Sequence, residues 1–221
     1  MYIGHYGFAF YLKKQANNQK SKIGEIPLWL IFISVQLVDF LCFFYVIFGI
    51  ERMKFSPNQN PWLRTHLEFF PYSHSLFMGA IIALFVLLVF WKLKGKVWGI
   101  ILSIGVLSHW VIDFLVHTPD LPIFLDSYKV GLGLWQHPWI AFLAEILMVT
   151  LGCYYLYKGS GLFLKPFILV ALMVALISRM FFLQDTEIVT TNMAMRAFIP
   201  LVINSLFVAL AYWVERKKER I

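Results

Sequence analysis

The chain has 221 residues, of which 60% are hydrophobic and 14% are charged, with a formal net charge of +7. This composition excludes an ordinary soluble domain, because such a surface needs about a quarter charged residues. A positive charge would also suit a nucleic-acid-binding protein, but the Lys and Arg residues gather beside apolar runs, as is typical of membrane proteins. The two cysteines, Cys42 and Cys153, lie inside such runs and indicate no disulfide framework.

The first element is the apolar stretch Met1–Leu12, which is too short to cross a bilayer core of roughly 30 Å. Lys13 and Lys14 follow it without a small-residue cleavage site, so we expect no cleavable signal peptide. One interpretation is an amphipathic helix that lies on the cytoplasmic face. The other is a short helix that enters the membrane from Lys13, which would put His5 roughly 12 Å deep at a rise of about 1.5 Å per residue.

Six apolar runs follow, each long enough to cross the bilayer as a helix, and lipid requires helices because the backbone must satisfy its own hydrogen bonds. The predicted fold is therefore an all-α transmembrane bundle that forms one integral membrane domain over residues 1–221. Residues 1–150 carry the candidate site, and residues 158–221 add two further spans. The predicted spans are Leu28–Ile50, His74–Trp91, Val97–Val116, Pro138–Tyr157, Pro166–Leu183 and Ala197–Trp213.

The connections between the spans differ in their positive charge, which predicts the orientation of the chain. One side has 13 Lys and Arg residues, at positions Lys13, Lys14, Lys20, Lys22, Lys92, Lys94, Lys96, Lys158, Lys165, Arg216, Lys217, Lys218 and Arg220. The other side has 5, which are Arg52, Lys54, Arg64, Lys129 and Arg196. Positive charge marks the cytoplasmic side, so both termini are predicted to be cytoplasmic, with membrane lipids as the surroundings. Six tryptophans are predicted to lie in the interfacial belts, namely Trp62, Trp91, Trp98, Trp135, Trp139 and Trp213.

Ionisable residues interrupt several of these spans, although each costs several kcal/mol in the bilayer centre unless it is paired, hydrated or bound to metal. Asp39 lies midway along the first span, His109 and Asp113 lie in the third, and Glu145 lies in the fourth. His74 opens the second span, and His117 and His137 bound the loop between the third and fourth.

The spacing of these residues indicates that they face one another. His109, Asp113 and His117 follow at intervals of four, so they share one face of a helix. His137 and Glu145 share a face in the same way if their helix begins as early as Gln136. At a rise of about 1.5 Å per residue, Asp39, His109 and Glu145 are predicted to lie in the middle to outer half of the membrane.

Imidazole and carboxylate groups together suit Zn²⁺, with Mn²⁺ or Fe²⁺ as alternatives, and a cation would offset the cost of burying the carboxylates. The competing interpretations are helix packing through polar groups and proton handling. Arg179, in the fifth predicted span, is the only basic residue deep enough to neutralise a carboxylate instead.

The same residues resemble a known family. The segments Gly4-His5-Tyr6-Gly7, Val38-Asp39, Tyr72-Ser73-His74-Ser75 and Ser108-His109-Trp110-Val111-Ile112-Asp113 resemble the bacterial inner-membrane predicted metal-dependent hydrolases, a group also labelled LexA-binding hydrolases. The resemblance covers about the first 150 residues and implies a bacterial inner-membrane protein with hydrolase activity.

The residue order is also similar to that of zinc phospholipase C and the fungal single-strand nucleases. The resemblance implies a metal-ligand set of His5, Asp39, His74, His109, Asp113, His117, His137 and Glu145. Those enzymes use an N-terminal Trp as a ligand, whereas this chain begins Met1-Tyr2. Their last His and Glu are one helical turn apart, whereas His137 and Glu145 are two turns apart. These departures favour one or two metal ions over three.

The first functional hypothesis is a membrane-embedded metal-dependent hydrolase that acts on a phosphoester of a lipid or lipid-linked substrate. It gives Asp113 and Glu145 catalytic roles and assigns contacts with the substrate phosphate to Arg179 or Lys129. The alternatives are a transporter of divalent cations or protons, and a non-catalytic membrane partner in which the polar residues hold helices together.

Overall fold

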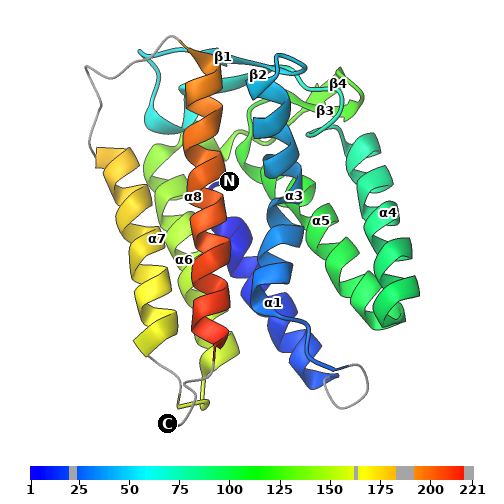
Figure 1. Ribbon diagram of the computed structural model, residues 1–221. Helices are drawn as coiled ribbons and strands as arrows, with labels where there is room; N and C mark the ends of the chain where they lie inside the picture. Colours follow the sequence, from blue (N-terminus) through cyan, green and yellow to red (C-terminus); the bar gives the residue numbers. More distant parts are fainter. Residues whose placement is uncertain (20–23, 162–163, 183–191, 217–221) are drawn as a thin grey trace.

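The protein is an all-α helical bundle (Figure 1) in the computed structural model, which describes residues 1–19, 24–161, 164–182 and 192–216. Six of its helices are long and apolar enough to cross a membrane, so the chain is a multi-pass membrane protein. These are α3 (Leu28–Ile47), α4 (Leu76–Lys94), α5 (Lys96–Val116), α6 (Pro138–Tyr157), α7 (Leu164–Phe182) and α8 (Met193–Glu215).

The six predicted spans are thereby confirmed, with shifted ends. The first helix ends at Ile47 instead of Ile50, and the second begins at Leu76 because Ser75 caps it by accepting a hydrogen bond from the amide of Met78. The last helix begins four residues before Ala197, where Asn192 caps it. Leu183 and most of the Gln184–Arg196 connector lie outside the described residues, as do Lys20, Lys22, Lys217, Lys218 and Arg220.

The N-terminal segment enters the bundle, as the second of the two interpretations predicts. Helix α1 (Gly4–Asn18) runs among the membrane helices, and His5, Tyr6 and Phe10 on it are fully buried. Its main partner is α6, which it approaches closely at two glycines. A Cβ atom on Gly7 would lie 2.3 Å from the carbonyl oxygen of Met148, and one on Gly152 would lie 2.2 Å from the carbonyl oxygen of Gly7. Larger residues at either position would push α1 away from α6.

Polar contacts fix α1 to the last span as well. The hydroxyl of Tyr6 donates a hydrogen bond of 3.0 Å to Asn204 on α8. At the lower end of α1, the buried ammonium group of Lys13 lies 2.5 Å from Glu215 and 3.2 Å from Glu25, and it donates to the carbonyl oxygen of Ile26 at 2.7 Å. These four residues, called the Lys13 cluster, join α1 to the end of α8 and to the segment before α3.

The upper end is covered by the long connections, which form two antiparallel hairpins that the sequence patterns did not predict (Figure 1). Strand β1 (Arg52–Phe55) pairs with β2 (Thr65–Phe69), and β3 (Leu121–Phe124) pairs with β4 (Ser127–Val130). Two aspartates join the hairpins, because Asp120 accepts the amide of Leu67 and Asp126 accepts the amide of Phe70. The 3-10 turns η1 (Pro61–Leu63) and η2 (Leu134–Gln136) lie in the same cap.

The interfacial prediction is wrong for three of the six tryptophans. Trp62, Trp98 and Trp135 are buried, with exposed fractions of 1%, 9% and 7%. Trp62 belongs to η1, and its indole N–H donates to the carbonyl oxygen of Pro138 at 3.0 Å. Tryptophans of the upper connections therefore pack into the bundle instead of facing the head groups, whereas Trp91, Trp139 and Trp213 are exposed.

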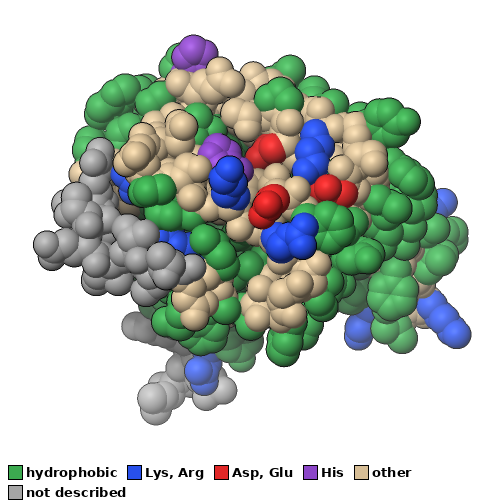
Figure 2. Space-filling view, turned by 90° about the horizontal axis from the view of Figure 1, so that it is seen from above, with side chains coloured by type: hydrophobic (Ala, Val, Ile, Leu, Met, Phe, Trp, Pro, Cys, Tyr) green, Lys and Arg blue, Asp and Glu red, His purple; other side chains and the backbone are tan. Residues whose placement is uncertain are grey.

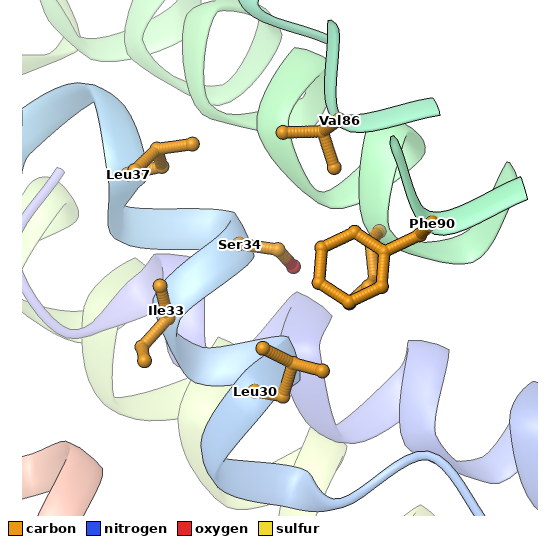
Figure 3. Close-up of a pocket in the computed structure, with 7 residues that line it drawn as sticks. Leu30, Ile33, Ser34, Leu37, Val86 and Phe90 are labelled. Carbon is orange, nitrogen blue, oxygen red and sulfur yellow. The ribbon is translucent and has the colours of Figure 1, made fainter. Parts of the chain in front are cut away.

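An apolar crevice lies between α3 and the pair α4 and α5 (Figure 3). Its only polar lining group is the hydroxyl of Ser34, which donates to the carbonyl oxygen of Ile31 at 2.8 Å. The other lining residues are Leu30, Ile33, Leu37, Val86, Phe90 and Leu102. The crevice suits a hydrocarbon chain and carries no group for chemistry, so the site lies elsewhere.

Candidate metal centre

Five of the predicted site residues meet in the upper half of the bundle. His5 comes from α1, Asp39 from α3, His74 from the segment before α4, and His109 and Asp113 from α5. Their ligand atoms form two overlapping groups whose members lie within 4.8 Å of one another: His5, His109 and Asp113, and Asp39, His74 and His109. Four of the five residues are buried, and the carboxyl group of Asp39 is 17% exposed.

One ring nitrogen of His109 forms a hydrogen bond, and the other has no hydrogen-bond partner among the described residues. Its Nδ1 lies 2.8 Å from the carbonyl oxygen of Val35, and since a carbonyl only accepts hydrogen bonds, Nδ1 carries the proton. The neutral ring therefore presents a lone pair on Nε2, which lies 3.2 Å from Asp113 and 3.5 Å from Asp39. This buried Nε2 has no hydrogen-bond partner among the described residues. A lone pair that faces two carboxylates is repelled unless a cation lies between them.

His74 is oriented by a relay of hydrogen bonds. The hydroxyl of Ser73 donates to the buried carboxylate of Glu51 at 2.5 Å, so its oxygen is left to accept the Nδ1 proton of His74 at 3.0 Å. Glu51 also accepts the amides of Tyr72 and Ser73 at 2.9 and 2.8 Å. The relay directs Nε2 of His74 to the cluster, and partners of this kind are what metal-binding histidines use on their second nitrogen.

His117 follows the same arrangement at the end of α5. Its Nδ1 lies 3.0 Å from a carboxylate oxygen of Asp120, and its Nε2 faces Asp113 at 3.7 Å. Burial, the largest single effect, raises the pKa of Asp120, but the hydrogen bond and charge of His117, the amide of Leu67 and the charge of His66 together outweigh it and lower the pKa below its usual value. Asp120 is therefore ionised at neutral pH and accepts the Nδ1 proton.

The two carboxylate oxygens of Asp113 face different parts of the protein. Oδ2 faces the Nε2 atoms of His74, His109 and His117, whereas Oδ1 accepts a hydrogen bond from Nε2 of His5 at 3.1 Å. The amino group of Met1 also contacts Oδ1. The ring of His5 stacks on that of His109, with the centroids 4.0 Å apart. Asp113 thus links His5 and Met1, at the N-terminal end of α1, to His74, His109 and His117.

The distances in the cluster fit a divalent metal. Two ligand atoms of a tetrahedral zinc ion are about 3.3 Å apart when each bond is near 2.0–2.1 Å. Nε2 of His74 lies 3.4 Å from Asp39 and 3.8 Å from Asp113, and the corresponding distances for His109 are 3.5 and 3.2 Å. Asp39, His74, His109 and Asp113 could therefore hold one ion. Because only Nε2 of His109 is available, the two overlapping groups compete for it.

Glu145 has a different set of contacts from those of the cluster. Its fully buried carboxylate accepts the amides of Tyr2 at 2.7 Å and Gly4 at 2.6 Å, at the beginning of α1. A carboxylate at a helix N-terminus satisfies its free amides and complements the helix dipole. We therefore assign Glu145 to positioning α1, and through α1 His5, instead of to the ligand or base role expected from the sequence.

Three other predicted site residues lie apart from the cluster. His137 is exposed at the start of α6, because Gln136 belongs to the turn η2 and the helix begins only at Pro138. Lys129 lies in the hairpin β3–β4, where it pairs with Asp126 at 3.1 Å and donates to the carbonyl oxygen of Glu68 at 2.9 Å. Arg179 is exposed on α7.

Several contributing residues were not predicted from the sequence. Glu51, Asp120 and the carbonyl group of Val35 orient the histidines, yet Glu51 lies far from His74 in the sequence. A weak signal did exist for two of them. Ser73 precedes His74 directly, and Asp120 follows His117 at an interval of three, within reach of its side chain.

Comparison with protein-family models, curated proteins and solved structures finds no match to this chain. The geometry of the cluster therefore carries the functional argument.

Proposed function

We propose that this protein is a membrane-embedded, metal-dependent hydrolase of a bacterial inner membrane that acts on a phosphoester of a lipid or lipid-linked substrate. The observation that supports this most directly is the unpartnered Nε2 of His109 among the described residues, facing the carboxylates of Asp39 and Asp113. Zn²⁺ suits this donor set best, and Mn²⁺ or Fe²⁺ are alternatives. The resemblance in the first 150 residues favours the same function.

The side chains of the cluster have distinct parts in this proposal. His74, His109, Asp39 and Asp113 would hold the ion. When bound, such an ion acts as a Lewis acid that polarises a phosphoryl oxygen and lowers the pKa of coordinated water. Asp39 is the most exposed of the four, so the site opens on the side of α3. His117, held by Asp120, presents its Nε2 at the edge of the cluster, where a reacting group would meet it.

The packing below the cluster favours a hydrolase over a transporter. A transit site needs a path from both faces of the membrane. The region of α1 below His5 is instead filled by Tyr6, Phe10 and Phe32, which are fully buried, and by the closed Lys13 cluster. Dense packing below the cluster supports a resident ion over a transported one.

The metal content of the purified protein tests the proposal. We expect about one Zn, Mn or Fe per chain by elemental analysis, and background levels in His109→Ala, since that variant loses a ligand common to both groups. His66→Ala is the matched control, because His66 lies in β2 outside the cluster. Release of phosphate or head group from a panel of phospholipids should follow the metal content.

Two results would contradict this function. If purified wild-type protein contained no Zn, Mn or Fe above background, the proposed metal centre would be wrong. Metal uptake into proteoliposomes without turnover of any phosphoester would favour the transporter.

A further inference from the structure

Trp135, in η2, has a buried donor without an acceptor. Its ring lies 4.2 Å from that of His117 and 6.2 Å from that of Tyr2, measured between centroids. Its indole N–H has no hydrogen-bond partner among the described residues, although only 7% of the side chain is exposed. The neighbouring Trp62, by contrast, donates to Pro138. Because an unpaired buried donor costs free energy, the N–H of Trp135 suits an acceptor that a ligand brings.

Tyr2 lies beside this donor, between the rings of Trp62 and Trp135. Burial, together with the nearby carboxylates of Glu145, Asp39 and Asp113, raises the pKa of Tyr2 above its usual value. The phenol is therefore a donor at any physiological pH. The guanidinium of Arg64 is also within electrostatic range of this phenol, and its charge acts on the pKa in the opposite direction.

Arg64 is the positively charged residue near Tyr2. It is half-buried at the end of η1, and its Nε donates to the carbonyl oxygen of Gln59 at 3.5 Å. Among the described residues it forms no ion pair with a carboxylate. Arg196 lies within electrostatic range of Arg64 and stacks over the ring of Phe55 at 3.3 Å. Figure 2 shows Lys, Arg, Asp, Glu and His side chains gathered on this upper face, whereas hydrophobic side chains surround them.

We propose that Trp135, Tyr2 and Arg64 form an oxyanion pocket that binds the tetrahedral phosphate group of the substrate beside the metal centre. The indole N–H, the phenol and the guanidinium are all hydrogen-bond donors. Arginine matches phosphate oxygens with two parallel hydrogen bonds. The pocket rests on the proposed function, and it replaces Arg179 and Lys129 as the predicted phosphate contacts.

Binding of inorganic phosphate to the full chain tests the pocket without any turnover. Calorimetry in a maltoside detergent, which contains no phosphate, should show binding to both the zinc-loaded and the chelator-treated protein. We expect Arg64→Gln to weaken binding about tenfold or more, and Trp135→Phe to weaken it severalfold, with an unchanged metal content. The matched controls are Arg52→Gln, on the same face, and Trp98→Phe, which is equally buried near the start of α5. Both should bind phosphate like the wild type.

The outcomes separate the pocket from the metal centre. Wild-type protein that binds metal but no phosphate, or Arg64→Gln and Trp135→Phe variants that bind phosphate as tightly as wild type, would overturn the pocket alone. Protein that takes up no Zn, Mn or Fe even when the metal is supplied, but whose phosphate binding still depends on Arg64, would support the pocket and overturn the hydrolase.

A second titration identifies the source of the phosphate. Phosphatidic acid is added to the micelles before inorganic phosphate is titrated. Competition that disappears in Arg64→Gln would assign the pocket to a lipid head group. Unchanged phosphate binding would assign it to a soluble phosphate ester.

Discussion

Two clusters of charged residues lie toward opposite ends of α1, and they differ in what faces the atoms that lack a hydrogen bond. In the Lys13 cluster, the ammonium group meets two carboxylates and a carbonyl, and Glu215 also accepts the amide of Leu28 at 2.5 Å. Oε1 of Glu215 has no hydrogen bond among the described residues, but it lies 2.5 Å from the ammonium group of Lys13. In the candidate metal centre, Nε2 of His109 and Nδ1 of His5 also have no hydrogen-bond partner among the described residues, and Nε2 of His109 faces two carboxylates.

The difference is consistent with a structural role for one cluster and a chemical role for the other. Each cluster has an ammonium group from the chain itself, because Lys13 faces Glu215 and the amino group of Met1 contacts Asp113. Around Asp39 and Asp113, however, His74, His109 and His117 have their Nδ1 atoms bound to other partners. Among the described residues Asp39 pairs with no Lys or Arg side chain, so a metal ion, as proposed, would offset the cost of its burial.

The largest expected effect on folding comes from breaking the paired cluster. Lys13→Met leaves the carboxylate of Glu215, which is 19% exposed, without its cation and should cost about 1–3 kcal/mol of stability. Thermal unfolding of the detergent-solubilised protein measures the loss, with Lys14→Met as the half-buried neighbouring control. The metal content of the molecules that remain folded should not change, and a parallel loss of metal would show that the two clusters are not independent.

A smaller effect is expected from loosening one histidine of the metal centre. Ser73→Ala removes the acceptor for Nδ1 of His74 and leaves Glu51 without that donor. Loss of such an outer partner typically lowers metal affinity about 10–100-fold. Competition with a chelator of known affinity measures it, and Ser205→Ala on α8 is the control. An unchanged affinity would mean that His74 is not a ligand.

The smallest effect concerns the link between His117 and the hairpin cap. Because the pKa of Asp120 is lowered in the folded protein, its ionised form stabilises the fold above the unfolded pKa of about 3.9, and this contribution is lost as the pH falls. Asp120→Asn should therefore be less stable than wild type by about 1 kcal/mol near ~pH 6, and the difference should shrink towards ~pH 3. Unfolding midpoints of both proteins across this pH range measure the stability difference. A difference that grows as the pH falls would contradict the prediction.

The sequence predicted the spans and the convergence of five residues because both follow from local rules. Long apolar runs must be helices in lipid, and the interval of four between His109 and Asp113 places them on one face. Burial of α1 was one of two open interpretations. It depends on close packing of Gly7 against Met148 and Gly152, which are 141 and 145 residues further along the chain (148 − 7 and 152 − 7), and no local pattern reveals such an approach.

The contacts around the ligands could not be predicted, because they join segments through irregular backbone. Glu51 reaches His74 only because a hairpin brings the end of α3 beside the start of α4. Trp135 was expected at the interface because tryptophans near span ends commonly lie there, whereas the turn η2 directs it inward against His117. Glu145 was expected at the metal for its charge, yet the amides of α1 occupy both of its oxygens.

Helix α1 has 15 residues and begins inside the bundle, so it does not cross the bilayer by itself. It meets Asp113 at its first turns and fits against α6 through two glycines, which requires that the surrounding spans already stand in place. We therefore expect the long helices to insert first and the short helix to dock afterwards, which brings His5 to the candidate metal centre. If the proposed metal ion binds, it would then bind only after α1 has docked among the membrane helices.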